Sequence, residues 1–166
     1  MYENLTIYND VVMDFPKRKQ HRLSNFDYSQ SGLYFITICV QTRENILSEI
    51  CKDTSEVKLT DVGDVIDKGI KNIGYIYSGV SVDNYVIMPN HVHLIIRIEA
   101  NDNSDNPSIN NVIKGLKTYV TKQIGNSIWQ KSFYDHVIRG ENDYKVKSEY
   151  IDNNPRKWIE DELYIE

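Results

Sequence analysis

The sequence predicts an α+β fold in which helices cover one face of an antiparallel sheet and a further helix follows at the C-terminal end. Apolar residues alternate with period two in several short segments and recur at intervals of three and four in others. These segments succeed one another as strand, helix, strand, strand, helix, strand, helix. The 166 residues contain no internal repeat or evident boundary, so we expect one domain over residues 1–166.

The first half of this pattern contains three strands and one helix. Residues 33–40 are rich in β-branched and aromatic side chains and follow a glycine, which predicts a strand. Thr60 is a suitable N-cap for an amphipathic helix that continues to Tyr77. Residues 80–88 and 90–98 predict two further strands, joined by a Pro-Asn turn as a hairpin-like pair.

The second half contains a helix, a strand and a last helix. Ser108 is the expected N-cap of a helix whose apolar residues again recur at helical spacing. Residues 132–138 predict the fourth strand, and residues 141–154 predict the last helix, ended by Pro155 because proline disfavours helical geometry in the residue before it. The order βαββαβ is that of a ferredoxin-like plait, to which the last helix is appended.

Composition and charge limit the classes of function. The chain is 40% hydrophobic and 26% charged, with no apolar run long enough to cross a membrane and no signal-like leader, so we expect a cytoplasmic protein. Its two cysteines are expected to be free thiols, with Cys39 in the core. A net charge of −5 argues mildly against nucleic-acid binding. Basic residues are nevertheless clustered in residues 1–22, which we expect to form a flexible basic arm.

Two histidines in the third predicted strand are the most informative feature. His91 and His93 lie two residues apart in an alternating run, so they project from one face of the strand while Val92 and Leu94 project from the other. Two imidazoles in this arrangement can reach a single metal ion. If the Val92 face packs on the helices, the histidines lie on the open face, where the last helix could cover them.

The last helix contributes two polar groups on one face. Tyr150 and Asn154 are four residues apart, which places a phenol and an amide oxygen on the same side of the helix. Together with the histidines they would form a site with two nitrogen ligands, one oxygen ligand and an adjacent nucleophile. Such a mixed set favours Mg²⁺ or Mn²⁺ over a structural zinc ion.

These residues lie within segments that resemble a known family, over residues 20–160. The triplet His91-Val92-His93 resembles the histidine–apolar–histidine (HUH) signature of single-tyrosine transposases, and the order and spacing of all the segments are similar to those of the REP-associated tyrosine transposases. The four similar segments are Gly32-Leu-Tyr-Phe-Ile-Thr-Ile-Cys39, Met88-Pro-Asn-His-Val-His-Leu94, Trp129-Gln-Lys-Ser-Phe-Tyr-Asp-His-Val-Ile-Arg139 and Tyr150-Ile-Asp-Asn-Asn-Pro155.

The resemblance implies an activity and a role for each site residue. In that family a tyrosine attacks a phosphodiester of single-stranded DNA, forms a 5′-phosphotyrosine link and releases a 3′-hydroxyl; the DNA substrates are imperfect hairpins. Tyr150 would be the nucleophile, His91 and His93 would bind a divalent metal, and Asn154 would be its third ligand. The residues that could contact DNA are Lys17, Arg18, Lys19, Arg22, Lys117, His136 and Arg139.

Two other functions fit parts of the pattern. A histidine-triad hydrolase also carries His-apolar-His on a strand, but it needs a third histidine where this chain has Ile95. A plait of this kind could also be a non-catalytic binder of single-stranded nucleic acid, which would present aromatic side chains on its open sheet face. The sequence leaves open whether the protein is a monomer or a homodimer, and whether the tyrosine would serve its own subunit's metal site.

Overall fold

The protein folds around one four-stranded antiparallel sheet. The structure is a computed structural model that describes residues 27–100 and 107–165. The sheet consists of β1 (Gly32–Cys39), β4 (Val80–Ile87), β5 (His91–Ile98) and β6 (Tyr134–Ile138) in the order β4-β5-β1-β6. This strand order, with two crossover connections, confirms the predicted ferredoxin-like plait.

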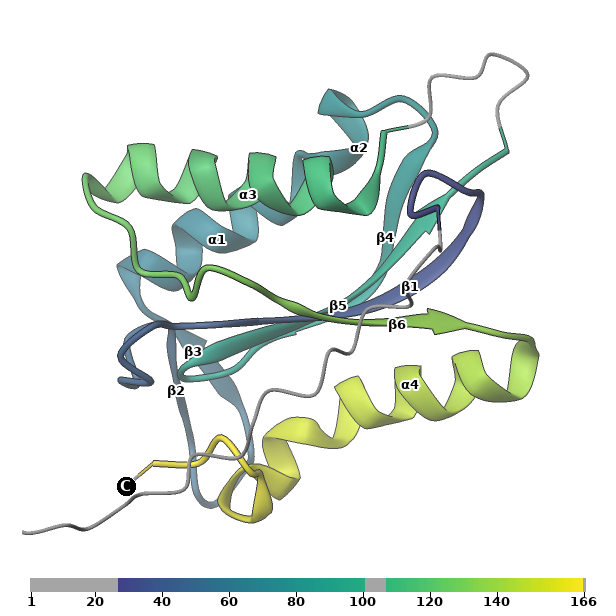
Figure 1. Cartoon of the computed structure of the whole chain (residues 1–166). Helices are drawn as coiled ribbons and strands as arrows, with labels where there is room; N and C mark the ends of the chain where they lie inside the picture. Colours follow the sequence, from purple (N-terminus) through teal and green to yellow (C-terminus); the bar gives the residue numbers. More distant parts are fainter. Residues whose placement is uncertain (1–26, 101–106, 166) are drawn as a thin grey trace, which may run out of the picture.

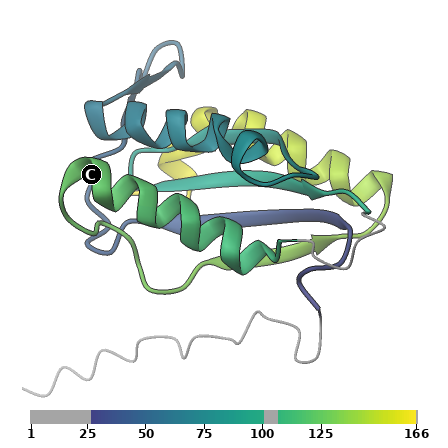
Figure 2. The same ribbon diagram turned by 90° about the horizontal axis from the view of Figure 1, so that it is seen from above.

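Helices lie on both sides of this sheet, with different roles. The helices α1 (Asp61–Lys71), α2 (Ile73–Ile76) and α3 (Ile109–Ile124) cover one face, whereas α4 (Glu141–Asn153) lies against the opposite face (Figure 1). Seen from above, α1 and α3 run roughly along the strands (Figure 2). No helix in the described part of the chain is long and apolar enough to cross a membrane.

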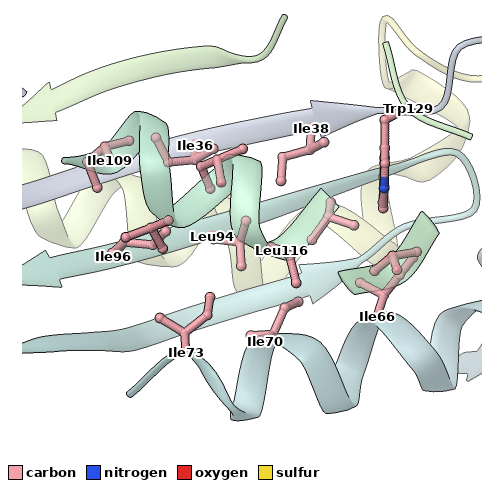
Figure 3. Close-up of a cluster of buried hydrophobic side chains, with 14 of the residues drawn as sticks. Ile36, Ile38, Ile66, Ile70, Ile73, Leu94, Ile96, Ile109, Leu116 and Trp129 are labelled. Atoms are coloured by element: carbon pink, nitrogen blue, oxygen red, sulfur yellow. The ribbon is translucent and has the colours of Figure 1, made fainter. Parts of the chain in front are cut away.

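The main core lies between the sheet and α1, α2 and α3, as Figure 3 shows. It is built from the alternate residues of β1 and β5 that face these helices, including Ile36, Ile38, Leu94 and Ile96, all of which are buried. Since successive side chains of a strand point to opposite faces, this packing commits the intervening residues of both strands to the α4 face. The histidines of β5 therefore lie on the α4 side, as predicted.

The helix boundaries confirm the two predicted N-caps. The Thr60 hydroxyl accepts a hydrogen bond from the Gly63 amide at 3.1 Å, and the Ser108 side chain likewise accepts one from the Asn111 amide. The helix predicted from Thr60 to Tyr77 is divided, because Asn72 ends α1 and α2 begins immediately after it. The apolar pattern continues across this break, since Ile73 remains buried.

Two further features of the structure differ from the sequence predictions. The short strands β2 (Ser48–Ile50) and β3 (Val57–Leu59) form a separate two-stranded sheet that the sequence analysis missed. Cys39 is only half-buried rather than in the core, because the alternation of β1 places it opposite His91 on the α4 side. Neither cysteine forms a disulfide with another described residue, as expected.

The last predicted helix is followed by a further element. After α4 ends at Asn153, the chain continues as the 3₁₀ helix η1 (Asn154–Glu160), with Pro155 in its first turn. Proline is tolerated there because the first amides of a helix have no partner within the helix. Helix α4 is fixed to the sheet by the buried Ile151, which packs with Phe35, Ile95 and Ile138. The η1 segment and the residues after it then lie beside the histidines.

Candidate active site

Two buried histidine rings of β5 form the centre of the candidate site. The His91 side chain is fully buried and His93 is 3% exposed. Their Nε2 atoms lie 3.0 Å apart, and the two ring planes meet at 71°. The Nε2 edges of both rings therefore converge on one point, which is the geometry that two ligands of a single metal ion require.

The hydrogen bonds on the other side of each ring prepare the histidines for metal binding. The side chain of Asn90 lies with its Oδ1 atom 2.8 Å from the His91 Nδ1 atom. Its Nδ2 atom donates to the carbonyl oxygens of Arg43 and Leu163, at 3.0 and 2.7 Å. The amide orientation is thereby fixed, so His91 must carry its proton on Nδ1 and present a lone pair on Nε2.

The His93 ring is also held by a hydrogen bond at its Nδ1 atom. The His93 Nδ1 atom lies 2.8 Å from the hydroxyl oxygen of Thr37, its neighbour on β1. A hydroxyl can accept as well as donate, so Thr37 can accept a proton from Nδ1 when Nε2 binds a metal.

Burial keeps both imidazoles neutral. It lowers the pKa of His91 to about 4, with a smaller opposing effect from Asp161. Burial also lowers the pKa of His93 well below its ordinary value, and the positive charge of Lys147 acts in the same direction. Because the metal-binding form of histidine is the neutral one, both rings are ready to bind at neutral pH.

A carboxylate that the sequence analysis did not select completes this cluster. Atoms of His91, His93 and Asp161 all lie within 4.8 Å of one another, so this group could hold a metal ion. The Leu163 amide donates to Asp161 Oδ1 at 2.8 Å, and Asn154 Nδ2 donates to Asp161 Oδ2 at 3.2 Å. The sequence analysis assigned no role to Asp161. Only the turn after η1 brings it to the histidines.

Asn154, the predicted third ligand, lies at the same place and also contacts Asp161. Its side chain is 3% exposed, and its Nδ2 atom holds Asp161. Its Oδ1 atom is buried, and no residue that the structure describes donates a hydrogen bond to it. An unpaired buried carbonyl oxygen is costly unless a ligand satisfies it, so the donor set of two imidazole nitrogens, a carboxylate and this oxygen fits a hard divalent cation.

Tyr150 lies beside this cluster within the same chain. Its ring centroid is 5.1 Å from that of His93 and 5.9 Å from that of Phe35, both in edge-on contact. The side chain is 45% exposed, so its face toward solvent remains accessible to a substrate. Partial burial raises the pKa of the Tyr150 phenol, as does the charge of Asp161, while a hydrogen bond from Asn154 opposes them. The structure thus brings together Tyr150, Asn154 and both histidines.

Three other predicted residues lie away from these groups. His136 Nε2 lies 2.9 Å from a carboxylate oxygen of Asp143, which also accepts the Arg139 amide at 2.8 Å, so His136 and the Arg139 backbone fix the start of α4. Lys117 lies on α3, across the sheet, and donates to two carbonyl oxygens of the chain, at 2.9 and 3.1 Å. The remaining predicted DNA contacts lie outside the described residues; they are Lys17, Arg18, Lys19 and Arg22.

The structure also bears on the two alternative functions. Ile95, at the position where a histidine triad needs its third histidine, is fully buried beneath α4. Phe35, the aromatic residue at the centre of the open face, is only 3% exposed because α4 covers it. The two central strands, β1 and β5, therefore present no exposed aromatic side chain on this face, unlike a single-strand binding sheet.

A ferredoxin-like sheet with a paired-histidine cluster and an adjacent helical tyrosine defines the class of HUH single-tyrosine transposases. No family model matches the sequence. An uncharacterised protein of Haemophilus influenzae is 30% identical over 171 residues, covering 90% of this chain and 94% of the relative. A second protein of that organism, named "Putative REP-associated tyrosine transposase", is 30% identical over 154 residues, covering 81% of this chain and 77% of the relative.

The chain belongs to the REP-associated tyrosine transposases, as these relatives show. A REP-associated tyrosine transposase of Escherichia coli is also 30% identical, over 81 residues and 47% of each chain. A solved structure described as such a transposase bound to a REP hairpin has the same fold. It superposes with a TM-score of 0.64 at 22% identity, covering 82% of this chain and 73% of that one.

Proposed function

We propose that this protein cleaves and rejoins single-stranded DNA through a covalent bond to Tyr150, in a reaction that depends on a divalent metal. The observation that carries the proposal is the contact between the Tyr150 and His93 rings, 5.1 Å apart, beside two Nε2 atoms 3.0 Å apart. A half-exposed nucleophile next to a convergent pair of neutral imidazoles fits metal-assisted phosphoryl transfer. The DNA would be a hairpin, like the one bound in the related solved structure.

The bonding changes balance without an external energy source. The Tyr150 phenolic oxygen attacks phosphorus as it loses its proton, and the bond from phosphorus to the 3′ oxygen breaks. The 3′ oxygen leaves and takes up a proton, while the 5′ side stays on the tyrosine as a phosphodiester. One phosphodiester replaces another, so a 3′-hydroxyl can reverse the step and join a strand without ATP.

The metal would be held by the groups that converge beneath the tyrosine. His91 and His93 would donate their Nε2 lone pairs, Asp161 a carboxylate oxygen and Asn154 its unpaired Oδ1. The oxygen donors favour Mg²⁺ or Mn²⁺. When bound, such an ion supplies positive charge next to the phosphate that reacts. Asn90 and Thr37 would keep both rings in the orientation that binding requires.

Adduct formation with a labelled DNA hairpin tests this function. We expect the wild-type protein with Mn²⁺ to form a denaturation-resistant protein–DNA band, and Tyr150→Phe to form none because it lacks the attacking oxygen. Tyr75→Phe is the matched control, since Tyr75 is 90% exposed and lies on α2, on the other side of the sheet. Absence of an adduct with the wild-type protein, despite hairpin binding, would instead favour a non-catalytic binding domain.

The histidines can be tested separately from DNA binding. We expect His91→Ala to abolish the adduct while leaving hairpin affinity within a few-fold of wild type, because the residue would hold metal rather than DNA. A loss of hairpin affinity as large as the loss of cleavage would assign His91 to the DNA contact and refute its role in metal binding.

A further inference from the structure

A lysine on the tyrosine helix brings a positive charge to the candidate site. Lys147 precedes Tyr150 by three residues on α4, so both side chains lie on neighbouring positions of one helix face. The Lys147 Nζ atom lies 5.0 Å from the centroid of the Phe35 ring, over the ring face. The same ring is in contact with Tyr150 and is stacked on His93 with centroids 5.3 Å apart. Lys147, Tyr150 and His93 therefore surround one buried aromatic ring.

No carboxylate of the described residues forms a close ion pair with this charge, although Asp143, one turn earlier on α4, interacts with it at longer range. Lys145, on the same helix, has a Glu149 carboxylate 3.9 Å from its Nζ atom, and Lys71 on α1 has Asp67 at 2.6 Å. Lys147 is half-buried, and neither an ion pair nor a hydrogen bond joins it to any residue that the structure describes. A partly desolvated ammonium with three unused donors is a binding group for an anion.

The field of this charge reaches the site. The Lys147 ammonium contributes to the lowered pKa of His93, after burial and His91, although His93 is buried under the helix. An anion bound at Lys147 would lie close to His93 and Tyr150, because both side chains contact the Phe35 ring that the ammonium covers. In a reaction with single-stranded DNA, the anion that must come to this place is a backbone phosphate.

We propose that Lys147 is a further catalytic residue, which binds the phosphodiester under attack by Tyr150. The inference rests on the proposed function and adds a protein-borne cation to the charge supplied at the histidine cluster. The ammonium would donate hydrogen bonds to the non-bridging oxygens, which gain negative charge as the phenolic oxygen adds to phosphorus. The flexible lysine stem can follow the phosphate while its methylene groups stay on the Phe35 ring.

Three variants of the full chain separate the charge from the packing. Lys147→Met keeps an unbranched stem over Phe35 and removes the charge, Lys147→Arg restores the charge, and Lys145→Met removes a solvent-facing charge from the same helix. With saturating hairpin and Mn²⁺, we expect Lys147→Met to slow single-turnover adduct formation by roughly tenfold to a hundredfold. Lys147→Arg should recover most of the rate, and Lys145→Met should match wild type.

These variants can also overturn the proposal. An unchanged rate in Lys147→Met, an equal loss in Lys145→Met, or a failure of Lys147→Arg to recover any rate would each contradict it. Mn²⁺ affinity and the thermal midpoint should be the same in Lys147→Met and wild type. A drop in either that matches the loss of rate would assign the lysine a structural role.

A binding measurement tests the contact without requiring cleavage. In the Tyr150→Phe protein, we would replace single phosphates of the hairpin strand by neutral methylphosphonates. We expect the methylphosphonate at one position to weaken binding to the Tyr150→Phe protein, which retains Lys147. The same replacement should have little effect on binding to the Tyr150→Phe, Lys147→Met double variant. The slope of log affinity against log salt should also fall by about 0.7 on removal of Lys147. Equal effects at every phosphate in both proteins would refute the contact, whereas failure of wild type to form an adduct would refute only the proposed function.

Discussion

At the scale of single residues, the Asn90 side chain determines how His91 can bind a metal. Its amide is held by two backbone carbonyls and leaves His91 only one tautomer. We expect Asn90→Ala to lower Mn²⁺ affinity by roughly tenfold to a hundredfold, because such outer hydrogen bonds orient the ligands. Isothermal titration with Mn²⁺ measures this effect, with Asn153→Ala, an exposed site on α4, as the control. Equal affinities in Asn90→Ala and wild type would show that the orientation does not depend on the amide.

Asp161 is the residue that most extends the predicted metal site. We expect Asp161→Asn to reduce Mn²⁺ affinity at least about tenfold, because a neutral amide replaces the only carboxylate in the cluster. Glu162→Gln removes a charge from the exposed neighbouring position and should have little effect on the titration. If the two variants lose affinity equally, Asp161 would act only through general charge, and the histidines with Asn154 would be the ligands.

The buried histidines also predict a pH dependence of stability. His91 has a pKa of about 4 in the folded protein against an ordinary value of 6.5, so the unfolded chain binds the proton more tightly. Stability without metal should therefore be highest above pH 6.5 and fall as the pH drops from 6.5 towards 4, by at most about 1.4 kcal/mol per pH unit for this group. The free energy of unfolding, measured in urea with a chelator across this pH range for wild type and His91→Gln, tests the predicted pH dependence. If the stability of both proteins changed with pH in the same way, the low pKa of His91 in the folded protein would be contradicted.

At the scale of elements, the sequence predicted most of the structure where its apolar residues have a clear period. Alternation in β1 and β5 predicted which residues face the core, and helical spacing with Thr60 and Ser108 predicted where α1 and α3 begin. The strands β2 and β3 were missed because each has only three residues, too few to establish a period. Asp161 was missed for a related reason. It follows a 3₁₀ helix, and no local pattern indicates that this turn returns to β5.

Helix α1 gives a prediction in which packing outweighs helix propensity. Gly63 lies against the backbone of Leu47, and a methyl group at this position would overlap the Leu47 carbonyl oxygen. Although alanine is the better helix former, we expect Gly63→Ala to destabilise the protein by about 1–3 kcal/mol because the backbone must move. Lys68→Ala, at an exposed position of the same helix, should be near neutral in urea unfolding. A stabilised Gly63→Ala would show that the contact can relax.

At the scale of the whole molecule, the two faces of the sheet are packed differently. One face is committed to the main core with α1, α2 and α3, whereas the other carries the histidines and is only partly covered by α4 and η1. The C-terminal segment also connects the parts of the site. The Leu163 backbone accepts a hydrogen bond from Asn90 and donates one to Asp161. The net charge of −5, which argued against DNA, describes the total and not this face, where Lys147 lies.

The arrangement within one chain predicts an active site that does not need a second subunit. Tyr150 and His93 of the same chain are in ring contact, so the nucleophile would act at its own histidines. We expect a mixture of Tyr150→Phe and His91→Ala proteins to form no adduct, since each chain would lack one essential part. Adduct formation by the mixture, at a level that increases with total protein concentration, would show that the tyrosine serves the partner's histidines.

The central claim is that the phenolic oxygen of Tyr150 becomes covalently joined to the 5′ phosphate of the cleaved strand. Mass spectrometry of the digested adduct, formed with an unlabelled hairpin and Mn²⁺, tests it most directly. We predict that the nucleotide mass will be found on the peptide that contains Tyr150, at the tyrosine itself, and that the released strand will end in a 3′-hydroxyl. A nucleotide on any other residue, or cleavage that leaves both strand ends free of protein, would contradict the account.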